Sequence, residues 1–448
     1  MASLVFDSAI YRDAFGAASM REVFSDARTI ESQVAVEVAL ARVQGRLGVI
    51  PREAADAIAA RCNASGIDLA ALKKKTEVVG YPIVGLVAQL AGQCGEAGRY
   101  LHWGATTQDI IDTALVLQLR DALGLVAGDL QGIAAALAGL ARAHKMTVMA
   151  GRTHLQQALP VTFGYKAAVW LSMIERHGRR LEELKPRVLM GQFAGAAGTL
   201  ASLGARGLEV SDALMDELGL GKPDIPWHVA RDGLAEAVGF LGLVTGTLAK
   251  IATDVMLMMQ TEIAEAFEPF EEGRGSSSTM PQKRNPIACE FIIAAAKVVR
   301  QQAGLMLDGM VADHERATGP WQAEWVALPQ AFIAASGALK HARSMLEGLV
   351  VDPARMRRNL DVTGGLIMAE AVMMAFAEHV GRQEAHHIVY GACRKALEAG
   401  STLADELARL PEVTRHLSAA DIVRLTDPAS YLGSAPAMVE RVLAGSRT

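Results

Sequence analysis

A run of residues from Gly273 to Glu290, GRGSSSTMPQKRNPIACE, combines residue types that could bind and process an anion. Gly273 and Gly275 give the backbone conformational freedom, serines supply hydroxyls, and Lys283 supplies positive charge before a helix that we expect to begin at Pro286. Free backbone N–H groups and the helix dipole would hold a negative ligand there. Gly/Ser runs are often solvated linkers, but an apolar helix follows this one directly, which favours a site loop.

Other clusters of polar residues lie elsewhere in the chain. His154 stands between Thr153 and Gln156, whose polar groups could orient its ring for proton transfer, although a lone histidine is often structural. The segment HWGATTQDIIDT, 102–113, places polar side chains at the start of a helix, with Asp109 and Asp112 as candidate caps. On its own, that segment would indicate only a helix start.

Together these segments resemble the active-site regions of the fumarase/aspartase superfamily, and the resemblance covers nearly the whole chain. The signature loop of that superfamily, GSSxMPxKxNP, reads Gly275 to Pro286 here with one extra serine. The resemblance implies Ser277 as the catalytic base, although Ser276 and Ser278 are neighbours of open role. It also implies His154 paired with Glu290 as the acid.

The same resemblance assigns the remaining site residues. A serine can act as a base only in a cationic pocket that favours its alkoxide, and Lys283 would supply that field. Donors around the substrate would stabilise an aci-carboxylate intermediate. Arg316, in DHERATGPWQAEW, is either a carboxylate clamp or part of an exposed charged turn. The implied substrate-binding residues are Thr106, Thr107, Gln108, Thr153, Gln156, Asn285 and Arg316.

The elements that must position these residues are helices. Hydrophobic residues make up 51% of the 448 residues but aromatic ones only 5%, which favours helices over strands. We expect an all-α fold of three helical domains: 1–105, a central long-helix bundle 106–350 with the signature loop at 271–286, and 351–448. The expected long helices are 110–144, 160–184, 230–267, 286–310 and 325–349.

Apolar residues surround the axis of helices such as 230–267, so these helices must be buried on all sides. One copy of the chain cannot hide that surface, which indicates a homo-oligomer, and the resemblance implies a homotetramer with active sites shared between subunits.

Composition also limits the partners and the location. A net charge of −5 gives no basic surface for nucleic acid. The apolar run 238–259 is interrupted by Lys250 and Asp254, which indicates a core helix and no membrane span. The cysteines are scattered and no basic leader precedes an apolar run, so we expect a cytoplasmic enzyme with a small carboxylate substrate, no metal and no cofactor.

Several functions fit these observations. The first is a lyase that eliminates a group from a succinyl-type di- or tricarboxylate, with C–N cleavage that releases fumarate. The second is a 3-carboxy-cis,cis-muconate cycloisomerase of aromatic catabolism, a branch that segments such as PWHVARD, 226–232, resemble. KTEVVGYPIVG, 75–85, lacks the polar element of the adenylosuccinate lyase branch. A catalytically silent structural scaffold is the third.

Overall fold

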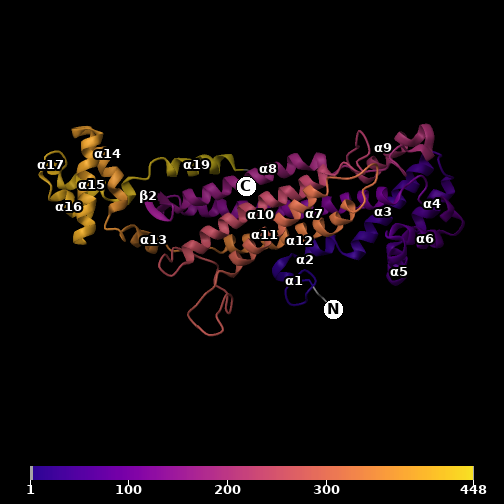
Figure 1. The fold of residues 1–448 in the computed structure, drawn as a ribbon, viewed down its shortest axis with the longest axis horizontal. Coiled ribbons are helices and arrows are strands. Elements are labelled where there is room, and N and C mark those ends of the chain that lie inside the picture. The colour runs from indigo at the N-terminus through magenta and orange to yellow at the C-terminus, as the bar shows by residue number, and fades with distance from the viewer. Residues whose placement is uncertain (1–3, 447–448) are drawn as a thin grey trace. The chain divides into compact units, whose positions relative to one another are not determined.

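The computed structural model describes residues 4–446, and the contacts among them divide the chain into two compact units. Unit 1 comprises Met1–Asp129, His177–Leu248 and Phe291–Lys340, and unit 2 comprises Leu130–Arg176, Ala249–Glu290 and His341–Thr448. The three-domain division expected from the sequence remains a prediction. The all-α expectation is confirmed, because the strands of the described residues form only two short two-stranded sheets (Figure 1).

Long helices contribute residues to both units. They are α7 (Thr107–Ala143), α8 (Phe163–Val188), α10 (Asp232–Met259), α11 (Ile287–Asp308) and α12 (Pro320–Glu347). Two of them, α7 and α10, are long and apolar enough to cross a membrane by length and composition, a test that buried core helices of soluble proteins also pass.

Most expected boundaries of the long helices lie a few residues from those in the structure, and two of these differences have a clear cause. The helix expected from residue 160 begins at Phe163, because Pro160 pairs with Ala150 in a β-hairpin. The helix expected to end at residue 267 ends at Met259, and the chain then turns through Ala264, which has a positive φ of 51°.

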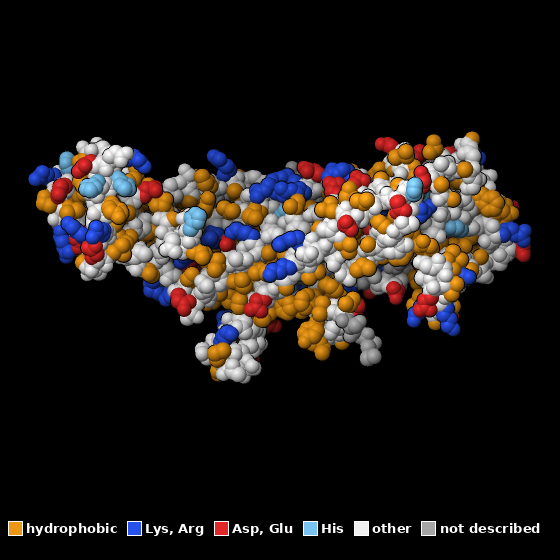
Figure 2. Space-filling view, viewed as in Figure 1, with side chains coloured by type: hydrophobic (Ala, Val, Ile, Leu, Met, Phe, Trp, Pro, Cys, Tyr) orange, Lys and Arg blue, Asp and Glu red, His pale blue; other side chains and the backbone are white. Residues whose placement is uncertain are grey.

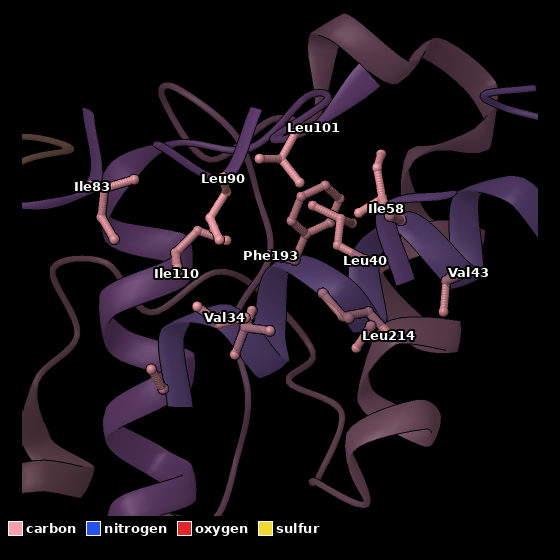
Figure 3. Packing of buried hydrophobic residues seen from close by; sticks show 14 of the residues in the cluster. Val34, Leu40, Val43, Ile58, Ile83, Leu90, Leu101, Ile110, Phe193 and Leu214 are labelled. Atoms are coloured by element: carbon pink, nitrogen blue, oxygen red, sulfur yellow. The ribbon is translucent and has the colours of Figure 1, made fainter. Parts of the chain in front are cut away.

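Unit 1 also contains the shorter helices of the N-terminal region. They are α1 (Arg12–Phe15), α2 (Ala18–Val23), α3 (Asp26–Arg46), α4 (Arg52–Arg61), η1 (Ala64–Gly66), α5 (Leu69–Val79), α6 (Ile83–Cys94), η2 (Gly95–Tyr100), η3 (Ala201–Arg206) and α9 (Gly207–Leu218). The Ser25 hydroxyl caps α3 by accepting a hydrogen bond from the Arg28 N–H. Figure 3 shows Val34, Leu40, Ile110 and Phe193 packed together, so this core fixes the start of α7.

Unit 2 contains the β-hairpin and the C-terminal helices. Its elements are β1 (Val148–Thr153), β2 (Gln156–Thr162), β3 (Ala266–Phe267), β4 (Val350–Val351), α13 (Pro353–Leu360), η4 (Leu366–Met368), α14 (Ala369–Val380), α15 (Arg382–Ala399), α16 (Leu403–Ala408), α17 (Pro411–Thr414), α18 (Ala419–Leu425), η5 (Pro428–Ser430) and α19 (Ala435–Gly445). Asp352 caps α13, as its Asp-Pro start predicts. Buried Ala150 of β1 packs with Leu360 and Met368, which holds the hairpin on α13 and η4.

The cysteines are all free, but two of them are neighbours. The sulfurs of Cys62 and Cys94 lie 3.3 Å apart at the ends of α4 and α6. Burial and the contact with Cys94 raise the pKa of the Cys62 thiol. The sequence shows only their wide separation, so the structure was needed to find this pair.

Candidate active site

Asp109 organises the start of α7 in unit 1. Its carboxylate accepts hydrogen bonds from the Thr106 N–H at 2.9 Å, the Ala194 N–H at 3.0 Å and the Gly195 N–H at 2.9 Å. The His228 ring lies 2.8 Å from the same carboxylate. The expected cap at Asp109 is therefore present through Thr106, and it also ties the 194–195 segment to the helix.

Gln108 and Arg316 meet in unit 1. Gln108 is 1% exposed, and its side-chain N–H donates to the His228 carbonyl at 2.9 Å. Arg316 donates to the Gln108 side-chain oxygen and, at 2.7 Å, to the Ala196 carbonyl. The structure thus brings together two of the residues that the sequence assigns to substrate binding. Gln108 already has partners within its own chain, so it can orient Arg316, while Thr106 and Thr107 remain half-buried at the helix start.

Asp112 is not the helix cap that its position suggested. Its carboxylate accepts from Arg231 at 2.7 and 3.1 Å, from Gln192 at 2.8 Å and from Trp321 at 3.2 Å. Arg231 also binds Glu324, and all three charged residues of this triad are at most 3% exposed. Burial raises the pKa of the Glu324 carboxyl, although Arg231 opposes that shift. This network ties α7 to Gln192, Arg231 and Trp321 through a buried carboxylate. Sequence reasoning did not predict it.

His154 lies at the tip of the β1–β2 hairpin in unit 2. Thr153 pairs with Gln156 across the strands, so His154 and Leu155 form a two-residue turn. Both have positive φ, 50° and 62°, the geometry of a type I′ turn, which normally selects Asn and Gly. Thr153, His154, Leu155 and Gln156 are all exposed. Strain of this kind at non-glycine residues clusters at functional sites.

The signature loop is closed at its base. Ser276 and Arg284 form an antiparallel bridge, and the Asn285 N–H donates to the Gly275 carbonyl at 2.8 Å. Gly275 has a φ of 66°, and a Cβ there would lie 2.4 Å from the Asn285 carbonyl oxygen, so the position requires glycine. The loop projects from the helix ends of its own unit between α10 and α11 (Figure 1).

Ser276 and Ser277 differ in their hydrogen bonds. The Ser277 hydroxyl oxygen accepts from the Thr279 N–H at 3.3 Å and from the Met280 N–H at 3.1 Å. Donors aimed at an oxygen favour its ionised form. The Ser276 hydroxyl instead donates to the Gly273 carbonyl at 2.8 Å, which favours the neutral form. Of these two hydroxyls, Ser277 is therefore the one whose hydrogen bonds favour an ionised oxygen.

The start of α11 differs from the expected anion site. The Ala288 and Cys289 N–H groups donate to the Glu268 carboxylate at 3.1 and 2.9 Å. The Ile287 N–H donates to the Asn285 carbonyl at 3.0 Å. The free N–H groups expected at this helix start are thus occupied by the chain itself, so the charge of the loop comes from side chains such as Lys283, which is exposed.

His154 and Glu290 are both exposed, and no hydrogen bond or ion pair joins them within the part of the chain that the structure describes. Their pairing stays a prediction. Among residues 4–446 there is also no group of three or more His, Cys, Asp or Glu side chains placed to hold a metal ion.

Comparisons with known proteins identify the family of the chain. Residues 10–300 match the lyase family, and residues 365–442 match the C-terminal region of adenylosuccinate lyase. The chain belongs to the fumarase/aspartase superfamily, and it is an enzyme of the lyase family.

Individual relatives differ in their reactions. The chain is 48% identical to a 3-carboxy-cis,cis-muconate cycloisomerase of Pseudomonas aeruginosa, over 96% of this chain and 95% of the relative. It is 42% identical to an N-acetyl-S-(2-succino)cysteine lyase of Dickeya dadantii, over 99% and 98% of the two chains. The crystal structure of a fumarate lyase from a Mesorhizobium species has 55% identity and a TM-score of 0.91, with 96% of this chain and 99% of that chain covered. These similarities favour the cycloisomerase alternative over the C–N cleavage that we placed first from the sequence.

Proposed function

We propose that the protein is a cycloisomerase that acts on 3-carboxy-cis,cis-muconate or a closely related tricarboxylate. The similarity to a cycloisomerase over nearly the full length of both chains supports this proposal. The substrate would be held by the half-buried threonines at the start of α7 and by Arg316, whose guanidinium suits a carboxylate.

The chemistry is an intramolecular addition. One carboxylate oxygen of the substrate bonds to an alkene carbon, which closes a lactone, and a proton is added to the neighbouring carbon beside another carboxylate. Ser277 would give that proton, and the resulting alkoxide would be stabilised by the N–H groups of Thr279 and Met280. Lys283 and Asn285 would stabilise the aci-carboxylate that forms first.

The two N–H groups aimed at the Ser277 oxygen are the observation that carries this assignment. The test is incubation of the purified protein with 3-carboxy-cis,cis-muconate, with loss of the conjugated diene followed by absorbance and the lactone identified by NMR. Ser277→Ala should abolish turnover, whereas Ser278→Ala, a change at the exposed neighbouring serine, should leave it nearly unchanged. Equal loss in both variants would contradict the role of Ser277.

A second candidate is β-elimination from a succinyl-type thioether or amine, with release of fumarate. Lactonisation uses a nucleophile that is already a carboxylate and expels no group, so it places no demand on a separate general acid. This chain nevertheless has His154 at the tip of a strained turn and Glu290 on α11. In elimination, Ser277 would take the proton beside a carboxylate, the C–S or C–N bond would break, and His154 would protonate the departing atom.

The two candidates are separated by substrate and by variant. N-acetyl-S-(2-succino)cysteine and N-substituted aspartates should release fumarate if the second candidate holds, and His154→Ala should then be strongly impaired. Muconate turnover that survives His154→Ala supports the first candidate. No turnover of any of these compounds would leave the structural scaffold as the remaining reading.

We also propose a cytoplasmic homotetramer whose active sites combine loops from several subunits. Exposed apolar side chains on the long helices support this assembly, and such side chains are visible over the surface in Figure 2. They include Val169, Leu243, Leu307 and Val326. Light scattering should give the mass of four chains. For a reaction that depends on His154, mixing Ser277→Ala chains with His154→Ala chains should restore part of the activity if sites are shared.

A further inference from the structure

The segment 263–268, between α10 and the signature loop, carries two buried carboxylates for which the proposed chemistry has no use. Glu265 is fully buried and Glu268 is 3% exposed. They stand on either side of β3, which pairs with β4. A buried carboxylate is retained only with partners that compensate its lost hydration. One hydrogen-bond partner of Glu265, Arg152, belongs to the His154 hairpin, and the partners of the Glu268 carboxylate lie at the end of the signature loop.

Glu265 holds the hairpin that ends in His154. Arg152 donates two parallel hydrogen bonds to its carboxylate, at 2.8 and 2.7 Å, and the Asn359 side chain donates a third at 2.8 Å. Gln157 faces Arg152 across the strands and donates to the Asn359 carbonyl at 2.7 Å. Both strands below the turn are therefore fixed through Glu265 and Asn359.

This anchoring explains how the turn can keep its backbone geometry. Two adjacent non-glycine residues with positive φ persist only where the surrounding structure enforces them. Leu155 is 77% exposed, so its own chain supplies little packing at the tip. The positive φ angles of the turn are therefore maintained from the strand ends, through the Arg152–Glu265 pair.

Glu268 holds the base of the signature loop. Its carboxylate binds the Ala288 and Cys289 N–H groups, and its own carbonyl accepts a hydrogen bond from Arg284 at 3.1 Å. The guanidinium of Arg284 also lies over the Phe270 ring, 5.2 Å from its centre. Since Arg284 is bridged to Ser276, this contact fixes both strands of the loop base beside Ser277.

We infer that Glu265 and Glu268 are positioning residues, one for each catalytic loop: Glu265 sets the place of the His154 turn, and Glu268 sets the place of Ser277 and Lys283. Their effect on turnover rests on the proposed function, whereas their effect on the loops does not. Each can therefore be tested with or without a known substrate.

The experiment compares Glu265→Gln and Glu268→Gln with Glu262→Gln, a matched control at an exposed carboxylate directly before the segment. In the wild type, the donors around each carboxylate face only oxygen atoms. A glutamine replaces one of these oxygens with an N–H₂ group that cannot accept their hydrogen bonds, so each change should loosen one loop. Peptide-level hydrogen exchange of the intact oligomer should rise at least about tenfold over 148–162 in Glu265→Gln and over 273–290 in Glu268→Gln. Neither peptide should change in the control.

Turnover supplies the second measurement. With whichever substrate the wild-type enzyme converts, Glu268→Gln should lower kcat about 10- to 100-fold with KM within about threefold, because a small displacement of a reacting group mainly affects the transition state. Glu265→Gln should do so only for a reaction that depends on His154. Should a glutamine variant not fold, Asn359→Ala and Arg284→Lys weaken the same two anchors more mildly.

The outcomes separate the two proposals. Suppose that no substrate is converted while hydrogen exchange still rises only over 148–162 in Glu265→Gln and only over 273–290 in Glu268→Gln. In that case the proposed function is wrong and the positioning roles stand. Unchanged exchange in both variants, or an increase spread evenly over unit 2, would overturn the positioning roles whatever the substrate. The same holds if kcat in Glu268→Gln equals that of the control.

Discussion

The candidate site residues of unit 1 and unit 2 are held in opposite ways. In unit 1, Gln108, Asp109 and Asp112 are almost fully buried, and every one of them is bonded to several partners of its own chain. In unit 2, His154 is exposed at the tip of the hairpin and Lys283 is exposed in the signature loop. The proposed binding residues are thus preorganised within one chain, whereas the proposed proton-transfer residues lie exposed on anchored loops.

The difference has an energetic basis. Buried carboxylates demand partners, so the unit 1 network adds rigidity but makes the fold sensitive to substitution. Exposed catalytic groups contribute little to stability and can be replaced without unfolding the chain. The comparison therefore predicts that changes in unit 1 affect stability most and changes in the unit 2 loops affect turnover most.

The largest expected effect is on stability, in unit 1. Arg231→Ala leaves the buried carboxylates of Asp112 and Glu324 without their cation, which should lower the free energy of unfolding by about 3–5 kcal/mol. Denaturant unfolding at fixed protein concentration measures it. Arg187→Ala, which breaks an exposed pair with Glu236, is the control and should lower the free energy of unfolding far less. Equal decreases in the free energy of unfolding would contradict the expected difference between buried and exposed ion pairs.

The next effect is on turnover, in unit 2. Ser277→Ala should lower kcat by about 10²–10⁴-fold because it removes the group that transfers the proton. Its melting temperature should stay within about 1 °C of the wild type, since only long hydrogen bonds within the loop are lost. Steady-state kinetics and thermal unfolding of the same preparation give both values. A large fall in melting temperature would place Ser277 with the structural residues instead.

A smaller effect depends on pH. Burial alone would lower the pKa of His102, but its hydrogen bond to Glu37 at 2.6 Å outweighs this and raises it. A raised histidine pKa stabilises the fold fully below about pH 6.5, the unfolded value, and that contribution disappears as the pH rises through the folded value. Glu37→Gln should therefore cost about 1.5–3 kcal/mol at pH 5.5 and less at pH 9. Thermal unfolding at the two pH values would reveal a constant cost if the histidine were not involved.

The smallest effect concerns reactivity in unit 1. Because burial and Cys94 raise the pKa of the Cys62 thiol, iodoacetamide should label Cys62 at pH 8 at least about tenfold more slowly than a free cysteine peptide. Peptide mass spectrometry measures the labelling rate. Labelling as fast as in the peptide would show that unit 1 opens around this pair.

Sequence reasoning located the helices well because their signals are local. Ser25 and Asp352, residue types that favour helix N-caps, both cap helices, and the long helices lie close to their predicted ranges. The hairpin at 148–162 was missed, because its turn has His-Leu where Asn-Gly would be the recognisable signal. Pro160 therefore looked like a helix start.

The candidate site was only partly visible in the sequence. Motifs identified Gln108, His154 and Ser277, but not the buried groups that support them. Arg231 binds Asp112 across 119 positions of the chain, and Glu265 binds Arg152 across 113. No local pattern carries such pairings, so they follow only from the folded structure. The choice between lactonisation and elimination likewise depends on a substrate that no motif names.

The bridge between Ser276 and Arg284 has a consequence for engineering the enzyme. Ser277 directly follows one residue of this bridge and Lys283 directly precedes the other, so the bridge restrains the backbone of both. Pro281 and Gln282 are exposed and follow Thr279 and Met280, whose N–H groups bind the Ser277 oxygen, so these two positions form a tip at which residues can be exchanged. A library of exchanges at this tip is a way to alter which substrates are accepted while the bridge keeps Ser277 and Lys283 in place.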